Sequence, residues 1–168
     1  MIHTLEQLYL QQLHDLYRAE TQLCDALPMM LNAITHKDLK NVFWVSLERS
    51  RQRRHWLDQI LTEMGHDATI TASTPMGGII RTSDEMIGGT SNEDVRDAAL
   101  IAVAQRIVHY QAAGYGTLVP FTIIMKRKND RSSIETALRE SKEMSELLLQ
   151  IATRTIHRAD AASYQAAS

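Results

Sequence analysis

The segment 92–118 constrains the fold of this 168-residue chain more than any other part of it. Its apolar and alanine residues recur at the spacing of a long amphipathic helix. Three polar side chains, Gln105, His109 and Gln111, lie on or beside the apolar face of that helix. Because an unpaired polar group in a core costs about 1–3 kcal/mol, this pattern is typical of a binding site inside a helix bundle. It is equally typical of a site that has lost its ligand.

Three further long helices are expected. Thr4 and Gln7 have the form of a capping box and predict a first helix that reaches about residue 32. Gly65 is a suitable residue to follow a second helix over 37–64. A fourth helix is expected over about 130–158, and residues 159–168, rich in Ala and Ser, are expected to fray.

Residues 65–90 form a long connection that contains Pro75 and two glycine pairs. We expect it to carry the chain from one end of a bundle to the other, with a short helix over about 76–86. Gly114, Gly116 and Pro120 predict a kink or break at the far end of the next helix. Four long helices with one long crossover predict an all-α, ferritin-like four-helix bundle over residues 1–158. An up-down-up-down bundle with short loops is the main alternative.

Composition limits the class of protein. With 44% apolar and 23% charged residues, the chain is expected to be globular. A net charge of −2 argues against nucleic-acid binding, and no segment has the length and hydrophobicity of a membrane span. The single cysteine, Cys24, and the lack of an apolar run after Met1 predict a cytoplasmic protein.

Carboxylates in the interior of such a bundle suggest a metal site. Di-metal ferritin-like bundles use one Glu from each of two helices and a Glu-x-x-His pair from each of the other two. Glu20 occupies an apolar position in the first helix, whereas Glu48 in the second is followed three residues later by Arg51. The third helix has no carboxylate near its middle, and no Glu-x-x-His pair lies within the four predicted helices. In the fourth helix, Glu140, Glu143 and Glu146 form a series that drifts round the helix, so only one or two of them can face inward.

The sequence resembles the YciE/YciF-type bacterial stress proteins, a family with a ferritin-like fold. Segments 95–102, 104–105, 109–110 and 115–118 look like the third-helix signature of that family. Segment 13–23 is similar to its first helix, and 47–50 lies where the family has a Glu-Thr motif. The resemblance implies a di-metal-type bundle that is usually dimeric and is associated with stress responses.

The resemblance also implies where a former di-metal site would lie. Its positions are Glu20, Glu48, Arg49, Arg51, Val108, Gln111 and Glu143. Val108 and Gln111 fall on the family's Glu-x-x-Glu pair, so both of those ligands are lost. The ligand of the second helix falls on Glu48 or on Arg49. Side chains expected to surround these positions are Gln105, His109, Tyr17 and Tyr110.

Carboxylates left in a metal-free core would repel one another and need compensation. The planar guanidinium of arginine can engage two carboxylates at once. The sequence therefore predicts that Arg49 or Arg51 pairs with the remaining acids in place of the metals.

Three functions follow from these patterns. The preferred prediction is a stress-associated structural homodimer without catalytic residues or a resident metal, with Trp44, Trp56 and Phe121 contributing to the dimer interface. The second is a di-iron or manganese oxidase, or a peroxide-consuming protein. Its non-standard ligands would be Glu20, Glu48, His109 and Glu143. The third is a partner-binding module that uses the arginine-rich second helix or the 65–90 connection.

Overall fold

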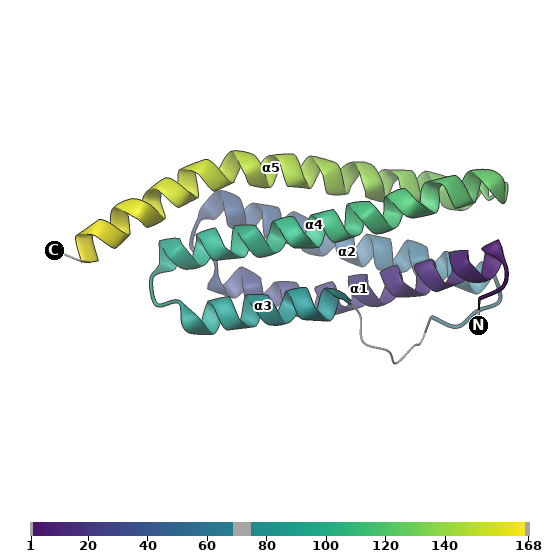
Figure 1. The fold of residues 1–168 in the computed structure, drawn as a ribbon, viewed down its shortest axis with the longest axis horizontal. Helices are drawn as coiled ribbons and strands as arrows, with labels where there is room; N and C mark the ends of the chain where they lie inside the picture. Colours follow the sequence, from purple (N-terminus) through teal and green to yellow (C-terminus); the bar gives the residue numbers. More distant parts are fainter. Residues whose placement is uncertain (1, 69–74, 167–168) are drawn as a thin grey trace.

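The chain folds into helices alone within the part that the computed structural model describes, residues 2–68 and 75–166. The helices are α1 (Leu5–Ala33), α2 (Lys37–Glu63), α3 (Pro75–Gly89), α4 (Glu93–Ile124) and α5 (Lys128–Ala166) (Figure 1). The all-α prediction is therefore confirmed, and the short helix expected over 76–86 is α3. Residues 69–74 of the predicted crossover lie outside the described residues.

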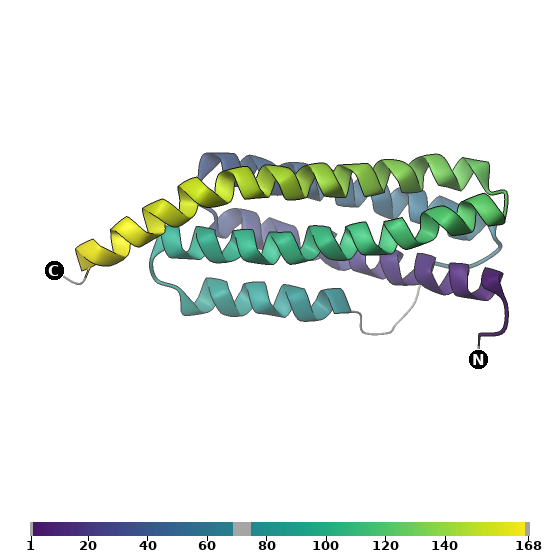
Figure 2. The ribbon, with the colours of Figure 1, turned by 45° about the horizontal axis from the view of Figure 1, so that its top comes forward.

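Four long helices lie side by side, and the short α3 packs against α1 and α4. Among the long helices, α1 packs on α2 and α4, and α5 packs on α2 and α4. Both views show α2 and α4 running in one direction and α1 and α5 in the other, with the C-terminal part of α5 extending past its neighbours (Figures 1 and 2). The interior is therefore lined by residues from all four long helices.

Local signals in the sequence explain where the helices begin and end. The Thr4 side chain accepts from the Gln7 amide at 3.1 Å and the Gln7 side chain bonds back to Thr4, which completes the capping box. The Asn92 side chain accepts from the Val95 amide at 3.1 Å and begins α4. Gly65 follows α2 with φ of 75°, a left-handed conformation that glycine adopts without a steric penalty.

Two expectations about helix ends concern α4 and α5. The predicted kink near Gly114, Gly116 and Pro120 stays a prediction, but a break there is absent, because α4 continues as one helix to Ile124. Pro120 is on the exposed side of α4, where water can hydrogen-bond the carbonyl that loses its helical partner. In addition, α5 continues to Ala166, so the helix does not stop at the boundary expected near residue 158.

Candidate functional site: a polar layer between two apolar clusters

The apolar interior is divided into two clusters. The larger cluster includes Leu23, Leu47 and Met144, and the smaller includes Leu16 and Leu57. Between them lies a layer of buried polar residues, one or two from each long helix. The members of this polar layer are Glu20, Ser50, Arg53, Gln111 and Ser141. The layer is the candidate site, because so many polar groups inside a core require a specific arrangement to be stable.

Glu20 of α1 is the carboxylate at the centre of the layer and is 0% exposed. The Tyr115 hydroxyl donates to its Oε1 at 2.8 Å, and Gln111 Nε2 donates to its two oxygens at 3.0 and 3.1 Å. Burial raises the pKa of Glu20, and this rise is opposed by the Arg53 charge and by hydrogen bonds from Ser50, Tyr115 and Gln111. Burial next to Glu20 also raises the pKa of Tyr115, which keeps its hydroxyl a donor.

Arg53 of α2 is the cation of the polar layer and is 3% exposed. Its Nη1 lies 3.9 Å from Glu20 Oε1, and its Nη2 lies 3.2 Å from Glu140 Oε2 on α5. Nη2 also donates to the Ala137 carbonyl at 3.3 Å, and the guanidinium carbon lies 5.6 Å from the centre of the Tyr115 ring. One guanidinium therefore joins acids on two different helices, because its planar group presents one nitrogen to Glu20 and another to Glu140.

A small cavity adjoins the guanidinium. It has a volume of about 10 Å³, and Arg53, Ser50 and Gln111 are among the residues that line it. Arg53 Nε is buried and has no hydrogen-bond partner among the residues that the structure describes. The cavity has about the room of one water molecule, which is the kind of partner that a buried N–H group requires.

Of the two arginines expected to pair with the remaining acids, Arg49 does so at the edge of the layer and Arg51 does not. Arg51 is on the surface and pairs with exposed Glu48 at 2.7 Å. Arg49 lies at the edge of the layer, 3.7 Å from Glu140 and 3.7 Å from Glu143. Arg53 pairs with Glu20 because it is on the inward face of α2, three residues after Ser50 and four before Leu57.

The remaining predicted positions are scattered around the layer. Val108 is buried in the larger apolar cluster, whereas Glu143 is half-exposed, at 48%. His109 is on the surface, where its Nε2 lies 3.4 Å from Ser145 Oγ, and Gln105 exchanges two hydrogen bonds with Ser145.

The two tyrosines expected beside the site lie outside its centre. Tyr110 is half-buried, and its hydroxyl donates to Asp15 through a short hydrogen bond. Tyr17 is half-buried, and its backbone carbonyl accepts from Thr21 at 2.9 Å. Of the predicted set, only Glu20 and Gln111 therefore lie in the polar layer itself.

The residues of the layer do not fit the di-metal centre that the ferritin-like resemblance implies. Hard cations require several carboxylate or imidazole ligands, whereas Glu20 is the sole carboxylate in the layer and a guanidinium lies 3.9 Å from it. Gln111 presents its amide nitrogen to Glu20. No group of three or more His, Cys, Asp or Glu side chains able to hold a metal occurs among residues 2–68 and 75–166.

One Glu-x-x-His spacing does occur at the end of the predicted second helix, at Glu63 and His66. Glu63 is the last residue of α2 and His66 lies beyond it, and both side chains are exposed. The spacing therefore does not contribute to the interior.

Sequence reasoning missed two contributors to the site, Arg53 and Tyr115, and it named Glu140 only as one of three candidate acids in the fourth helix. For Arg53 a signal exists, because it interrupts the apolar stripe of α2 as Glu20 interrupts that of α1. The neighbouring arginines concealed that signal. For Tyr115 the signal is its spacing of four residues from Gln111, which places both on one face of α4.

The described helices include none that is long and apolar enough to cross a membrane.

The fold and the polar layer define a class of all-helical protein in which a carboxylate, a guanidinium and an amide from different helices contact one another in the core. Residues 4–161 match a protein family described as a domain of unknown function, DUF892. The chain therefore belongs to the DUF892 family.

Named relatives agree with this assignment. Protein YciF of Escherichia coli (strain K12) is 30% identical over 156 residues, which cover 92% of this chain and 94% of YciF. The crystal structure of the E. coli stress protein YciF aligns with a TM-score of 0.84, covering 93% of this chain and 99% of that one. YcfI from Rhodopseudomonas palustris, described as a candidate structural protein, is 33% identical, with a TM-score of 0.80 and coverage of 88% of this chain and 94% of that one.

Proposed function

We propose that this chain is a ferritin-like, stress-associated structural protein in which a buried ion pair has replaced a di-metal centre. The observation that carries the proposal is the Arg53 guanidinium, 3.9 Å from Glu20 and 3.2 Å from Glu140, in the interior between α1, α2 and α5. The positive charge of a guanidinium compensates the acids there as a metal ion would. It also repels any cation that approaches the same oxygens.

The four long helices support the ferritin-like part of the proposal. The parallel course of α2 and α4 requires the connection between them to span the length of the molecule (Figure 1). A single such crossover distinguishes ferritin-like bundles from bundles with short loops.

The stress-associated and structural parts of the proposal are inferred from relatives. YciF is named a stress protein, and YcfI is described as a candidate structural protein. We extend both descriptions to this chain, together with a homodimeric state and a cytoplasmic location, because the chain belongs to the same family.

The metal content of the purified protein tests the proposal. Protein prepared without chelators and incubated with ferrous or manganous ions, then desalted, is expected to retain far less than one ion per chain. Retention of about two ions per chain, as di-metal bundles hold, would overturn the proposal in favour of the oxidase or peroxide-consuming alternative.

A rebuilt site supplies the positive control. The triple substitution Arg53→Met, Val108→Glu and Gln111→Glu removes the cation and restores two carboxylates on α4. Circular dichroism first establishes that this variant is helical. Metal retention by the rebuilt variant but not by the natural chain is the expected result, since the two differ only in these three side chains.

A further inference from the structure

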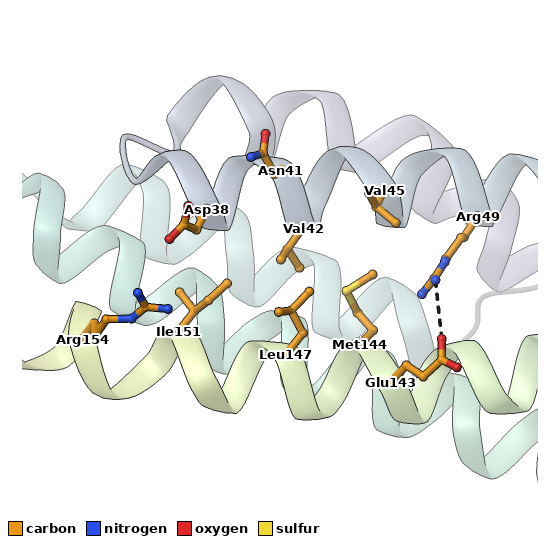
Figure 3. Close-up of a pocket in the computed structure, with 10 residues that line it drawn as sticks. All are labelled: Asp38, Asn41, Val42, Val45, Arg49, Glu143, Met144, Leu147, Ile151 and Arg154. Carbon is orange, nitrogen blue, oxygen red and sulfur yellow. Dashed lines mark ion pairs between the residues drawn. The ribbon is translucent and has the colours of Figure 1, made fainter.

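A shallow groove lies between α2 and α5 on the outside of the molecule, and it encloses about 470 Å³ (Figure 3). Its apolar lining consists of side chains from both helices: Val42, Val45, Met144, Leu147 and Ile151. Val42, Met144 and Ile151 are buried, whereas Val45 and Leu147 are 40% and 41% exposed. The groove therefore leaves apolar surface in contact with water, although both exposed groups already lie beside a neighbouring helix.

The charges at one end of the groove are paired with one another. Arg49 of α2 lies 3.7 Å from Glu143 and 3.7 Å from Glu140, both on α5. Figure 3 shows the Arg49–Glu143 pair across the groove. Glu143 also pairs with Arg139 at 2.7 Å. Both charges at this end are therefore occupied, and the pair marks where the apolar lining stops.

The opposite end of the groove carries a guanidinium in different surroundings. Arg154 of α5 is exposed, lines the groove and takes part in no ion pair among the residues that the structure describes. Asp38 of α2 faces it across the groove (Figure 3) but likewise forms no ion pair within the described chain. Asp38 is in the first turn of α2, where the positive end of the helix dipole already stabilises a carboxylate. Arg154 is therefore the lining cation that is available to an anion.

The distance between the two ends defines the size of a ligand. Met144 and Arg154 are ten residues apart on α5, which corresponds to about 15 Å along the helix. Leu147 and Ile151 lie between them and line the same groove. An extended chain of single bonds advances about 1.2 Å per bond, so about twelve carbons span this distance.

We propose that this groove binds a free, single-chain aliphatic carboxylate of about twelve carbons, which is a medium-chain fatty acid. Its carboxylate lies on the Arg154 guanidinium, whose planar group can donate two parallel hydrogen bonds to it. Its hydrocarbon chain lies along α5 and covers Val45 and Leu147, so that apolar surface of the ligand and of the protein leaves water. The volume agrees with this class of ligand, because small-molecule sites commonly enclose about 300–1,000 Å³ and combine an apolar lining with few polar groups.

The neighbouring groove between α1 and α2 is less suited to such a ligand. It encloses about 480 Å³ and has two cations in its lining, Lys40 and Arg51. Arg51 is already paired with Glu48 at 2.7 Å. Lys40 presents a strongly hydrated ammonium, which cannot make the bidentate contact that a guanidinium makes with a carboxylate. This groove therefore supplies the matched control for experiments on the first.

The head group of the ligand is tested first. Isothermal titration calorimetry compares dodecanoate, dodecanol and dodecyltrimethylammonium, each below the concentration at which it aggregates. Dodecanoate is expected to bind with one site per chain and at least about tenfold more tightly than the other two, because only the carboxylate makes a charge-assisted contact with the guanidinium. Circular dichroism in the same solutions establishes that the helices remain folded.

The substitution Arg154→Ser removes the proposed head-group contact. It is expected to raise the dissociation constant of dodecanoate about tenfold and to leave that of dodecanol unchanged. The matched control is Lys40→Ser, which removes an exposed cation from the α1–α2 groove and should change neither constant. Both side chains are exposed, so neither variant should lose stability.

The hydrocarbon chain is tested by its length and by its position. From octanoate to dodecanoate, the affinity is expected to increase by up to about threefold per methylene, and beyond dodecanoate the gain should stop at the Arg49–Glu143 pair. In methyl NMR spectra, dodecanoate should shift the resonances of Val45 and Leu147. Those of Leu31, in the lining of the α1–α2 groove, should stay in place.

The opposite results would overturn the proposal. Dodecyltrimethylammonium that binds as tightly as dodecanoate would assign recognition to Asp38 instead of Arg154. An unchanged dissociation constant in Arg154→Ser would show that the carboxylate lies elsewhere, as would methyl shifts confined to Leu31. An affinity that keeps rising beyond dodecanoate would contradict the size of the site. Absence of dodecanoate binding would show that the groove holds no such ligand.

Discussion

Glu20 and Asp97 are both carboxylates with 0% exposure, yet their surroundings differ completely. Asp97 of α4 accepts from the backbone amides of Thr35 and His36, at 3.1 and 2.7 Å, and from the Thr35 hydroxyl at 2.8 Å. All its donors belong to the short connection between α1 and α2. Glu20 instead depends on side chains from two other helices and on a guanidinium.

The difference shows two ways in which a core can accommodate a carboxylate. Backbone donors in a tight connection are fixed by the chain itself, so Asp97 needs no side-chain partner beyond one hydroxyl. The donors to Glu20 are fixed only while α1, α2 and α4 remain packed. Asp97 therefore holds one local connection in place, whereas Glu20 couples the helices across the whole interior.

Removal of the buried cation, Arg53, is expected to cause the largest loss of stability. Arg53→Met leaves Glu20 buried without a counter-charge and should lower the free energy of unfolding by about 3–5 kcal/mol. The loss should grow with pH. Without Arg53 the pKa of Glu20 rises further, so the native state holds a proton that the unfolded chain has released above pH of about 4.3. Each pH unit between that value and the pKa of Glu20 in the native variant then removes up to about 1.4 kcal/mol. Urea denaturation at pH 6 and pH 8 measures both effects.

Arg49→Met is the matched control for this variant. Arg49 also pairs with Glu140, but 27% of its side chain is exposed, so its loss should cost no more than about 1 kcal/mol. Equal losses in the two variants would contradict the central role of Arg53.

Removal of the Asp97 carboxylate should lower the free energy of unfolding less, and its effect should be concentrated in the connection between α1 and α2. Asp97→Ala leaves the amides of Thr35 and His36 without their acceptor and should cost about 2–3 kcal/mol. Hydrogen exchange should accelerate first at these two amides. Glu93→Ala, at a side chain that is 68% exposed in the same turn of α4, is the control and should change stability little. Acceleration that begins in the middle of α4 would show that Asp97 also acts over long range.

Loss of a single donor to Glu20 should give the smallest change. Tyr115→Phe removes the 2.8 Å hydrogen bond and should cost about 1–1.5 kcal/mol. Because that bond lowers the pKa of Glu20, the carboxyl should titrate at higher pH in the variant, as carbon-13 NMR can measure. Tyr110→Phe, which loses a bond to Asp15 instead, should leave the Glu20 titration in place.

Periodicity was sufficient to predict the helices, because each long helix buries one apolar stripe. The same criterion found Glu20, a charge on such a stripe. It would have found Arg53 as well, but four arginines between positions 49 and 54 made the inward face of α2 ambiguous. Of the two arginines named from the sequence, Arg49 pairs with Glu143 and Arg51 does not, whereas the buried Arg53 was missed.

Asp97 shows a different limit. An acid in the first two turns of a helix is usually explained by the helix dipole, and the sequence offered no reason to look further. Its actual partners, Thr35 and His36, are more than sixty residues away in the sequence. They contact Asp97 because the end of α1 and the beginnings of α2 and α4 lie at the same end of the bundle. Contacts between distant connections cannot be derived from the pattern of one helix.

The polar layer also depends on a residue without a side chain. Gly114 lies between Gln111 and Tyr115 on α4, and a methyl group there would come within 2.7 Å of Leu16, which is itself buried. Relief of that clash requires either Leu16 to shift within the core or α4 to move away from α1, and the second movement would lengthen the bonds from Gln111 and Tyr115 to Glu20. The distance between α1 and α4 therefore influences the pKa of Glu20, because the hydrogen bonds that lower this pKa cross from one helix to the other. A single carbon added at Gly114 is enough to disturb that distance.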